Sequence, residues 1–289
     1  MIGKLCLSAA LALAAFSAPA WAEPVTIVAA ENFYGDLASQ IGGAHVAVTS
    51  ILSNPDQDPH LFEASPQNAK ALKDAKIVIV NGVDYDPWME KLLKAGKAPG
   101  RKEIIVGALV GRKPGDNPHL WYDPAAMKAA AKALAAGLVA VDPAHQADYR
   151  EGEAKFVASL KPLEDKLAAM RKSYSGEPVT ASEPVFGYQA GLLGLNVRNE
   201  KFALAIMNNA EPTASEVAVF ENDLKGRRVK VMIYNGQASE PAVQRLVQMA
   251  KENGVPVVAV SETEPPGATY QAWMMGQLDA LDRALAPTQ

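Results

Sequence analysis

The sequence contains almost no cysteine. Cys6 is the only one among 289 residues, and it lies inside the apolar run Leu5 to Phe16. That run follows a lysine and leads to the small-residue triplet Ala20-Trp21-Ala22, the pattern of a secretory signal peptide that is cleaved before Glu23. Cys6 comes too early to be the lipid-modified cysteine that usually ends such a run, so we expect cleavage of residues 1–22 to remove it. The mature chain would then have no disulfide and no lipid anchor.

Two further features are missing. No later stretch approaches, without charges, the about 20 apolar residues that a transmembrane helix needs. The net charge is only −4 and both signs are interspersed, so the chain lacks the electrostatic footprint of a protein that binds nucleic acid or an anionic membrane. We therefore expect a soluble periplasmic monomer without a membrane anchor, whose ligand is a small molecule or an ion.

Short β-rich runs alternate with helical patterns in both halves of the mature chain. Such alternation indicates βαβ units, and hence a parallel sheet covered by helices. We expect two α/β lobes, residues 23–143 and 175–289. The expected strands are Val25–Ala30, Val46–Leu52, Ile77–Asn81 and Glu103–Val106 in the first lobe, and Val179–Ser182, Leu195–Asn199, Val229–Tyr234 and Val255–Ser261 in the second.

A long helix is predicted between the lobes, over residues 144–174. Its apolar residues, among them Tyr149, Phe156 and Leu163, are spaced three, four or seven positions apart with charges between them. At 1.5 Å per residue it would be about 45 Å long, enough to run along both lobes as a spine. A proline at position 162 should kink or split it near Ser159.

Two of the four histidines occur in similar settings. His60 and His119 each follow a proline and precede a leucine and an aromatic residue. Each also follows the carboxyl end of a predicted strand, which is the edge where open α/β sheets bind ligands. A single loop histidine is usually a solvated bystander, and we interpret His45 and His145 in that way. The repeated pattern at His60 and His119 favours a shared role.

The second lobe offers carboxylates at the corresponding edge. Glu183 follows Val179–Ser182, and Glu262 follows Val255–Ser261, with Glu264 two residues later as an alternative. Strand-end acids can serve solubility alone. Together with the two histidines, however, Glu183 and Glu262 would make a four-ligand site in a cleft between the lobes. Nitrogen and oxygen ligands without thiolate suit Zn²⁺ or Mn²⁺, with Fe²⁺ a weaker fit.

Four motifs span the mature chain in order: Asp-Pro-His-x-Phe-Glu, Pro-His-x-Trp-x-Asp-Pro, Ser-Glu-Pro-x-Phe-x-Tyr and Ser-Glu-x-x-Pro-Pro-Gly-x-x-Tyr-x-x-Trp. This order resembles the TroA-like family, the zinc- and manganese-binding solute receptors of ABC importers. The resemblance implies two α/β lobes joined by one rigid helix, with ligands at His60, His119, Glu183 and Glu262. The chain departs from the family in having Glu183 where histidine is frequent and Glu262 where aspartate is common.

Two residues are expected to support the ligands without binding the metal. Tyr188 could donate to a carboxylate, and Asn235 stands where many relatives have an acid. A carboxylate donor set shifts relative preference toward manganese, whereas the general affinity order still favours zinc. The sequence leaves the choice between them open.

The function predicted from these features is capture of zinc or manganese and its delivery to an ABC transporter permease, without catalysis. One alternative is a metallohydrolase that uses Glu183 or Glu262 as a general base. Its usual His-Glu-x-x-His helix motif is missing from the sequence. A periplasmic metal chaperone without a transporter is the second alternative, and the sequence does not exclude it.

Overall fold

The structure is a computed structural model that describes residues 23–55, 59, 62–238 and 240–287. The predicted signal peptide, residues 1–22, lies outside the described residues. So does His60, the first of the predicted ligands. The described part of the chain contains Pro55 and Phe62, which flank the segment that carries His60.

Two parallel four-stranded sheets form the framework, with strand orders β2-β1-β3-β4 and β6-β5-β7-β8. The two orders are the same, so the halves of the chain repeat one topology. The predicted fold class, two parallel α/β lobes, is confirmed. The strands are β1 (Val25–Glu31), β2 (Val46–Leu52), β3 (Ile77–Val80) and β4 (Lys102–Ile105) in the N-terminal lobe, and β5 (Pro178–Ala181), β6 (Asn196–Arg198), β7 (Met232–Asn235) and β8 (Val257–Val260) in the C-terminal lobe.

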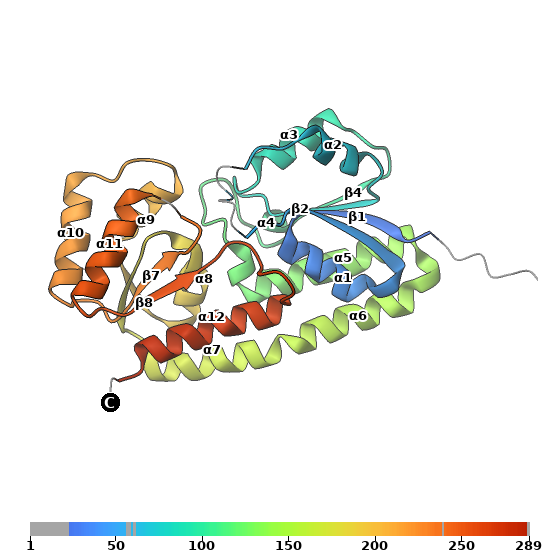
Figure 1. The fold of residues 1–289 in the computed structure, drawn as a ribbon. Coiled ribbons are helices and arrows are strands. Elements are labelled where there is room, and N and C mark those ends of the chain that lie inside the picture. The colour runs from blue at the N-terminus through green and yellow to red at the C-terminus, as the bar shows by residue number, and fades with distance from the viewer. Residues whose placement is uncertain (1–22, 56–58, 60–61, 239, 288–289) are drawn as a thin grey trace, which may run out of the picture.

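Helices cover both faces of the N-terminal sheet (Figure 1). Alternate residues of β1 point to opposite faces, so Ile27 packs into the core with α1 and α5, whereas Val28 packs with α2 and α3. This is why β1 and β3 are apolar almost throughout: a central parallel strand is buried on both sides. The helices of this lobe are α1 (Asn32–Gly42), α2 (Pro66–Lys73), α3 (Pro87–Ala95), α4 (Val106–Leu109) and α5 (Pro124–Val141).

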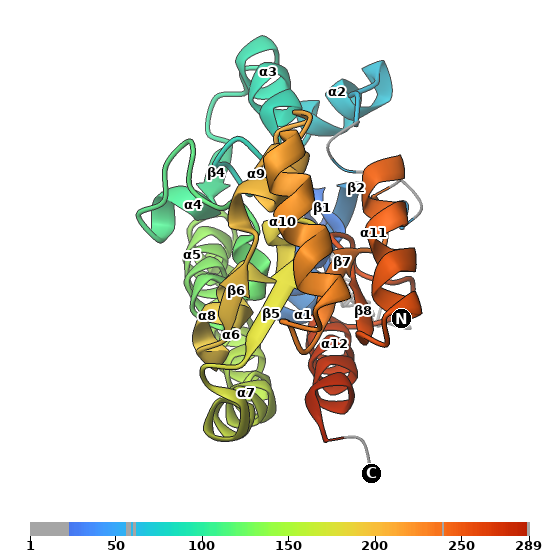
Figure 2. The ribbon, with the colours of Figure 1, turned by 90° about the vertical axis from the view of Figure 1, so that its left-hand side faces the viewer.

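The C-terminal sheet is covered in the same way. Met232 of β7 packs with the helices on one face, and the next residue, Ile233, belongs to the core on the other face. Figure 2 looks at this lobe and shows α10 and α11 in front, with α7 and α12 below. The helices are α8 (Gly187–Leu193), α9 (Glu200–Met207), α10 (Ala214–Lys225), α11 (Pro241–Glu252) and α12 (Tyr270–Leu285).

Two helices in line, rather than one, form the spine under both lobes (Figure 1). α6 (Gln146–Ser159) contacts α1 and α5, and α7 (Lys161–Tyr174) contacts α8 and α12. Leu160 separates them, and Pro162 lies in the first turn of α7, where its missing N–H group has no intrahelical partner to lose. Each half of the spine therefore packs against one lobe.

In the described part of the chain, α5 is the one helix long and apolar enough to span a membrane by length and composition. Leu134 and Leu138 on its buried face belong to the main core, and the helix contacts α1 and α6. We therefore interpret α5 as a core helix.

Candidate metal centre

His119 lies at the inner edge of the N-terminal lobe, just before the short 3-10 helix η3 (Leu120–Tyr122), and is fully buried. Oδ1 of Asn117 accepts the main-chain N–H of His119 at 3.0 Å and lies 2.7 Å from Nδ1 of the ring. An amide oxygen can only accept, so this network assigns the ring proton to Nδ1. Nε2 is then the ring nitrogen whose lone pair can coordinate a metal ion.

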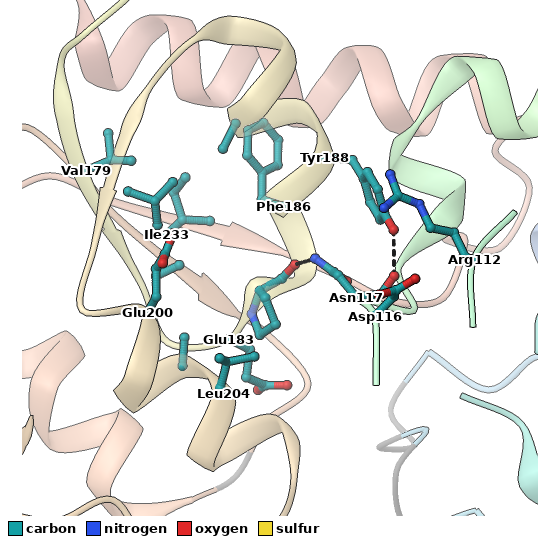
Figure 3. A pocket seen from close by; sticks show the side chains of 16 residues that line it. Arg112, Asp116, Asn117, Val179, Glu183, Phe186, Tyr188, Glu200, Leu204 and Ile233 are labelled. Carbon is teal, nitrogen blue, oxygen red and sulfur yellow. Dashed lines mark hydrogen bonds between the residues drawn. The ribbon is translucent and has the colours of Figure 1, made fainter. Parts of the chain in front are cut away.

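Asn117 also ties the two lobes together. Its Nδ2 group donates to the main-chain oxygen of Pro184 at 2.8 Å, and this second contact fixes the amide orientation that the ring of His119 requires (Figure 3). Pro184 directly follows Glu183. The contact therefore holds the loop of one predicted ligand against the residue that orients another.

Glu262 comes from the C-terminal lobe, after β8, and is also fully buried. Its Oε1 accepts from Nδ2 of Asn235 at 2.6 Å, and its main-chain N–H donates to Oε1 of Gln237 at 2.6 Å. Nε2 of Gln237 reaches across the cleft to the main-chain oxygen of Pro55 at 2.9 Å. The loop of Glu262 is thus linked to the loop of the N-terminal lobe that leads toward His60.

The two buried side chains face each other across the lobes. Nε2 of His119 lies 3.3 Å from Oε2 of Glu262. With bonds of about 2.0–2.1 Å to nitrogen and 2.0–2.2 Å to oxygen, two ligands of a tetrahedral zinc ion lie about 3.3–3.5 Å apart. A ring lone pair and a carboxylate oxygen repel unless a cation lies between them. The separation therefore fits two ligands of one metal ion.

Glu183 follows β5 and precedes the 3-10 helix η5 (Pro184–Phe186). It is 4% exposed and lines a cavity of about 410 Å³ together with Asn117 and Tyr188 (Figure 3). Apolar side chains of the C-terminal sheet, of the segment from η5 into α8, and of α9 form most of the other walls. The cavity thus borders the loop of Glu183 and Asn117, the residue that orients His119.

Tyr188 differs from expectation. Its hydroxyl donates to the main-chain oxygen of Asn117 at 2.7 Å, rather than to a carboxylate (Figure 3). The guanidinium of Arg112 lies 5.2 Å above its ring. Tyr188 thus holds the loop that carries His119 through the main chain of Asn117, and its contact with the predicted ligands is indirect.

The described residues alone do not complete a metal site. Across residues 23–55, 59, 62–238 and 240–287, no three His, Cys, Asp or Glu side chains converge closely enough to hold a metal ion. Among the predicted ligands, the structure pairs His119 with Glu262 and places Glu183 on the neighbouring loop. His60, which would be the fourth, lies outside the described residues.

Glu31 and Asp86 form a buried carboxyl pair next to this site that the sequence did not reveal. Both lie at the ligand-binding edge of the N-terminal sheet and are at most 1% exposed. Burial raises the pKa of Glu31 well above its usual range, and it raises the pKa of Asp86 to about 6. Of the two, Glu31 holds its proton more strongly, and Asp86 is the more acidic member of the pair. The strand-end rule that singled out Glu183 would also have found Glu31 at the end of β1.

Asp86 closes a strained turn. Its two oxygens accept the main-chain N–H groups of Asn81 at 2.7 Å and Gly82 at 2.9 Å. Gly82, Val83 and Asp84 have φ angles of 73°, 58° and 60°. Positive φ is costly for a β-branched residue such as Val83, and such strain, about 1–3 kcal/mol per residue, persists only where other contacts impose it.

The strained turn presents Tyr85 to the candidate site. Its ring centroid lies 4.8 Å from that of Trp121 and 6.0 Å from that of His119. Burial raises the pKa of the Tyr85 phenol well above its usual range, and the charge of Glu262 raises it further. The phenol thus stays protonated and faces the carboxylate of the opposite lobe.

Glu264, the alternative ligand, faces another partner. Its main-chain N–H donates to Oδ1 of Asn32 at 3.0 Å, and its main-chain oxygen accepts from Nδ2 of the same residue at 2.7 Å. These bonds dock the loop on the start of α1. Burial and, to a lesser degree, the charge of Asp36 raise the pKa of Glu264 to about 8. Its side chain therefore lies near α1, whereas Glu262 faces His119.

We expect Glu264→Gln to stabilise the metal-free protein at high pH. The folded-state pKa of Glu264 lies above its unfolded value, so its contribution to stability is complete below about pH 4.3 and is lost as pH rises through about 8. A neutral amide avoids this loss. Allowing for solvent screening, we expect a gain of about 1 kcal/mol at pH 9, or about 2–4 °C in Tm, and almost none at pH 5. Melting curves in chelator at both pH values measure the difference, and an equal gain at both would contradict it.

His45 and His145 lie together on the spine side of the N-terminal lobe. They end the 3-10 helices η1 (Gly43–His45) and η4 (Pro143–His145), and their rings stack at 3.8 Å between centroids. Nε2 of His45 lies 3.0 Å from Asp148, and Nδ1 of His145 lies 2.6 Å from Asp142. Each ring thus has its own carboxylate partner, and the stacked pair links the end of η1 to the end of η4.

Comparison with known proteins places the chain in a family. The ZnuA family, described as zinc-uptake complex component A, periplasmic, matches residues 27–284. The manganese-binding lipoprotein MntA of Bacillus subtilis (strain 168) is 23% identical over 282 residues, which cover 91% of this chain and 90% of MntA.

Solved structures share the fold. The periplasmic zinc-binding protein TroA from Treponema pallidum superposes with a TM-score of 0.77 at 17% identity, over 92% of this chain and 100% of TroA. The SBP FpvC from Pseudomonas aeruginosa, in complex with Mn²⁺, superposes with a TM-score of 0.74 at 21% identity, over 91% of this chain and 98% of FpvC. The family match covers most of the chain, and the chain therefore belongs to the ZnuA family of periplasmic zinc-uptake components.

Proposed function

We propose that this protein captures a divalent transition metal, zinc or manganese, in the periplasm and delivers it to the permease of an ABC importer. His119 and Glu262 bind the ion from opposite lobes, and His60 and Glu183 complete its coordination. The observation that carries the proposal is the 3.3 Å separation of two fully buried donor atoms, Nε2 of His119 and Oε2 of Glu262.

The surroundings of the pair support this function. Asn117 orients His119, and Asn235 and Gln237 hold Glu262, so both donor groups are fixed before the metal arrives. Hydrogen bonds to the far side of metal-binding groups are a regular feature of metal sites and raise their affinity. Two of these residues also join the lobes, since Asn117 donates to the main-chain oxygen of Pro184 and Gln237 to that of Pro55. A bound ion would therefore stabilise the closed arrangement that a permease can recognise.

A hydrolase is the weaker candidate. The chain belongs to a family of uptake components rather than enzymes. Catalytic zinc needs an open coordination position for water. Here His119 and Glu262 are both fully buried and in contact across the lobes, an arrangement suited to enclosing an ion.

The relatives leave the metal open, because MntA is named for manganese, TroA for zinc, and FpvC was solved with manganese. We propose zinc or manganese as the cargo, with iron(II) the third possibility. MntA is a lipoprotein. We propose that this chain, whose cysteine lies too early for lipidation, works as a free periplasmic monomer after removal of residues 1–22.

Metal binding should stabilise the protein against heat, because the ion bridges lobes of the folded chain and finds no preformed site in the unfolded one. At a hundredfold excess over Kd the gain is about 2.7 kcal/mol, or about 5–10 °C in Tm for a chain of this size. Melting curves of chelator-stripped protein with ZnCl₂ or MnCl₂ measure it. MgCl₂ is the control, since magnesium prefers all-oxygen octahedral sites. A Tm that stays the same in the presence of zinc, manganese or chelator would contradict the proposed function.

A further inference from the structure

The carboxylate of Glu262 has one oxygen held by an amide. Nδ2 of Asn235 donates to Oε1 over 2.6 Å, and both side chains are at most 2% exposed. Oδ1 of Asn235 accepts the main-chain N–H of Gln237 at 3.0 Å, so the amide cannot flip without losing both bonds. A bond this short to an ionised acceptor is of the charge-assisted kind, roughly twice as strong as a neutral one.

The other oxygen points into the cleft. Oε2 of Glu262 faces Nε2 of His119 at 3.3 Å. A metal bound between these two atoms thus meets one carboxylate oxygen directly. Asn235 already occupies one lone pair of Oε1 and fixes the orientation of the carboxylate, so coordination by both oxygens would draw charge from Oε1 and weaken a buried charge-assisted hydrogen bond.

The main chain at Asn235 and at Glu262 is also held by hydrogen bonds in which the Asn235 side chain takes no direct part. The main-chain N–H of Asn235 donates to Oγ of Ser182 at 3.1 Å, and that of Glu262 donates to Oε1 of Gln237 at 2.6 Å. The side chain of Asn235 adds two contacts to these bonds: its Oδ1 accepts the main-chain N–H of Gln237, and its Nδ2 holds Oε1 of Glu262.

We propose that Asn235 keeps Glu262 a one-oxygen ligand and thereby biases the site toward zinc over manganese. The inference rests on the proposed function and names the preferred metal. Zinc sites are almost always four-coordinate. Manganese prefers a larger set of oxygen ligands in octahedral geometry, so it gains more from a carboxylate that binds through both oxygens. Restricting Glu262 to one coordinating oxygen therefore lowers the affinity for manganese more than it lowers the affinity for zinc.

Two substitutions test this role on the full mature chain. Asn235→Asp is isosteric and keeps the acceptor for Gln237 but has no donor for Glu262. Asn235→Ala removes both without adding a charge. We expect the ratio of zinc to manganese affinity, from competition titrations with ZnCl₂ and MnCl₂, to fall at least about 10-fold in both variants, the lower end of the usual effect of a residue that supports a ligand. The visible spectrum of bound Co²⁺ should change from a four-coordinate form toward one of higher coordination.

Asn199→Ala is the matched control. Nδ2 of Asn199 donates to buried Asp223 at 3.1 Å in the same lobe, so the control loses the same kind of bond away from the cleft. It should lower the Tm and leave the metal ratio and the Co²⁺ spectrum as in the parent.

Each outcome decides. If the parent binds both metals and Asn235→Ala leaves their ratio unchanged, the inference is wrong while the proposed function stands. A change in Asn235→Asp alone would likewise overturn it, because the new carboxylate would then be acting as an added ligand. If the parent binds neither zinc nor manganese, the proposed function fails and the inference fails with it. Should Asn235→Ala not fold, Asn235→Leu takes its place, because leucine fills a similar volume without a donor or a charge; its metal ratio and Co²⁺ spectrum must then change, and an unchanged ratio overturns the inference.

Discussion

We expect His119→Ala to lower the affinity for zinc by at least about 100-fold. The histidine supplies Nε2 at 3.3 Å from Glu262, and its removal takes away a ligand rather than a support, so the loss should exceed the roughly 10- to 100-fold typical of a supporting residue. Calorimetric titration of chelator-stripped protein with ZnCl₂ measures the change. An affinity for zinc within threefold of the parent value would show that His119 is not a metal ligand.

The stability of this variant needs its own control. His119 is fully buried, so its side chain contributes to packing as well as to binding. Truncation leaves a cavity and removes the partner of Asn117. His119→Asn places an amide N–H group where Nδ1 lies and can still donate to Asn117, while no atom replaces Nε2, so it should keep a Tm closer to the parent than His119→Ala and still lose metal. His145→Ala, in the stacked pair at η4, is the histidine control and should bind as the parent does.

The sequence predicted the sheets well because their pattern is local. The apolar runs of β1 and β3 are long enough, and the intervening helices periodic enough, that a parallel α/β arrangement follows from them alone. The helices α9 and α12 were not predicted. α9 follows Asn199, which has a φ of 63° and makes no side-chain cap, so no start signal marks it. α12 follows a loop rich in proline and glycine, and its cap at Thr269 stands out only once the helix is known.

The candidate site was predictable only in part, for a related reason. Strand-end reasoning identifies which residues reach one edge of a sheet. It cannot tell which of two acids on one loop turns inward, and it cannot pair residues far apart in the chain. Glu31 and Asp86 illustrate the second limit, since their contact depends on how β1 and the turn after β3 meet. The strain at Val83 is likewise invisible until the backbone is known.

The choice between Glu262 and Glu264 is the sharpest test of the site. Glu262→Gln removes the negative charge from a carboxylate that faces His119, and we expect it to lower zinc affinity by at least about 100-fold, more than the loss of a supporting residue. Glu264→Gln should stay within about threefold of the parent. Its loop is docked on Asn32, and burial raises the pKa of Glu264 to about 8, so this side chain is largely protonated at neutral pH and a poor metal ligand.

The two substitutions are matched. Both are isosteric, both remove one carboxyl group from the same loop, and both positions are at most 5% exposed. Competition titrations with ZnCl₂ at pH 7, with melting curves in chelator to confirm folding, compare them directly. If Glu264→Gln loses the metal and Glu262→Gln keeps it, the ligand lies two residues further along the chain, and binding would have to turn the Glu264 side chain away from α1. Such a rearrangement would break the bonds to Asn32 that now join this loop to the N-terminal lobe. Metal would then open the contact between the lobes rather than strengthen it, contrary to the closure that the facing pair His119 and Glu262 implies.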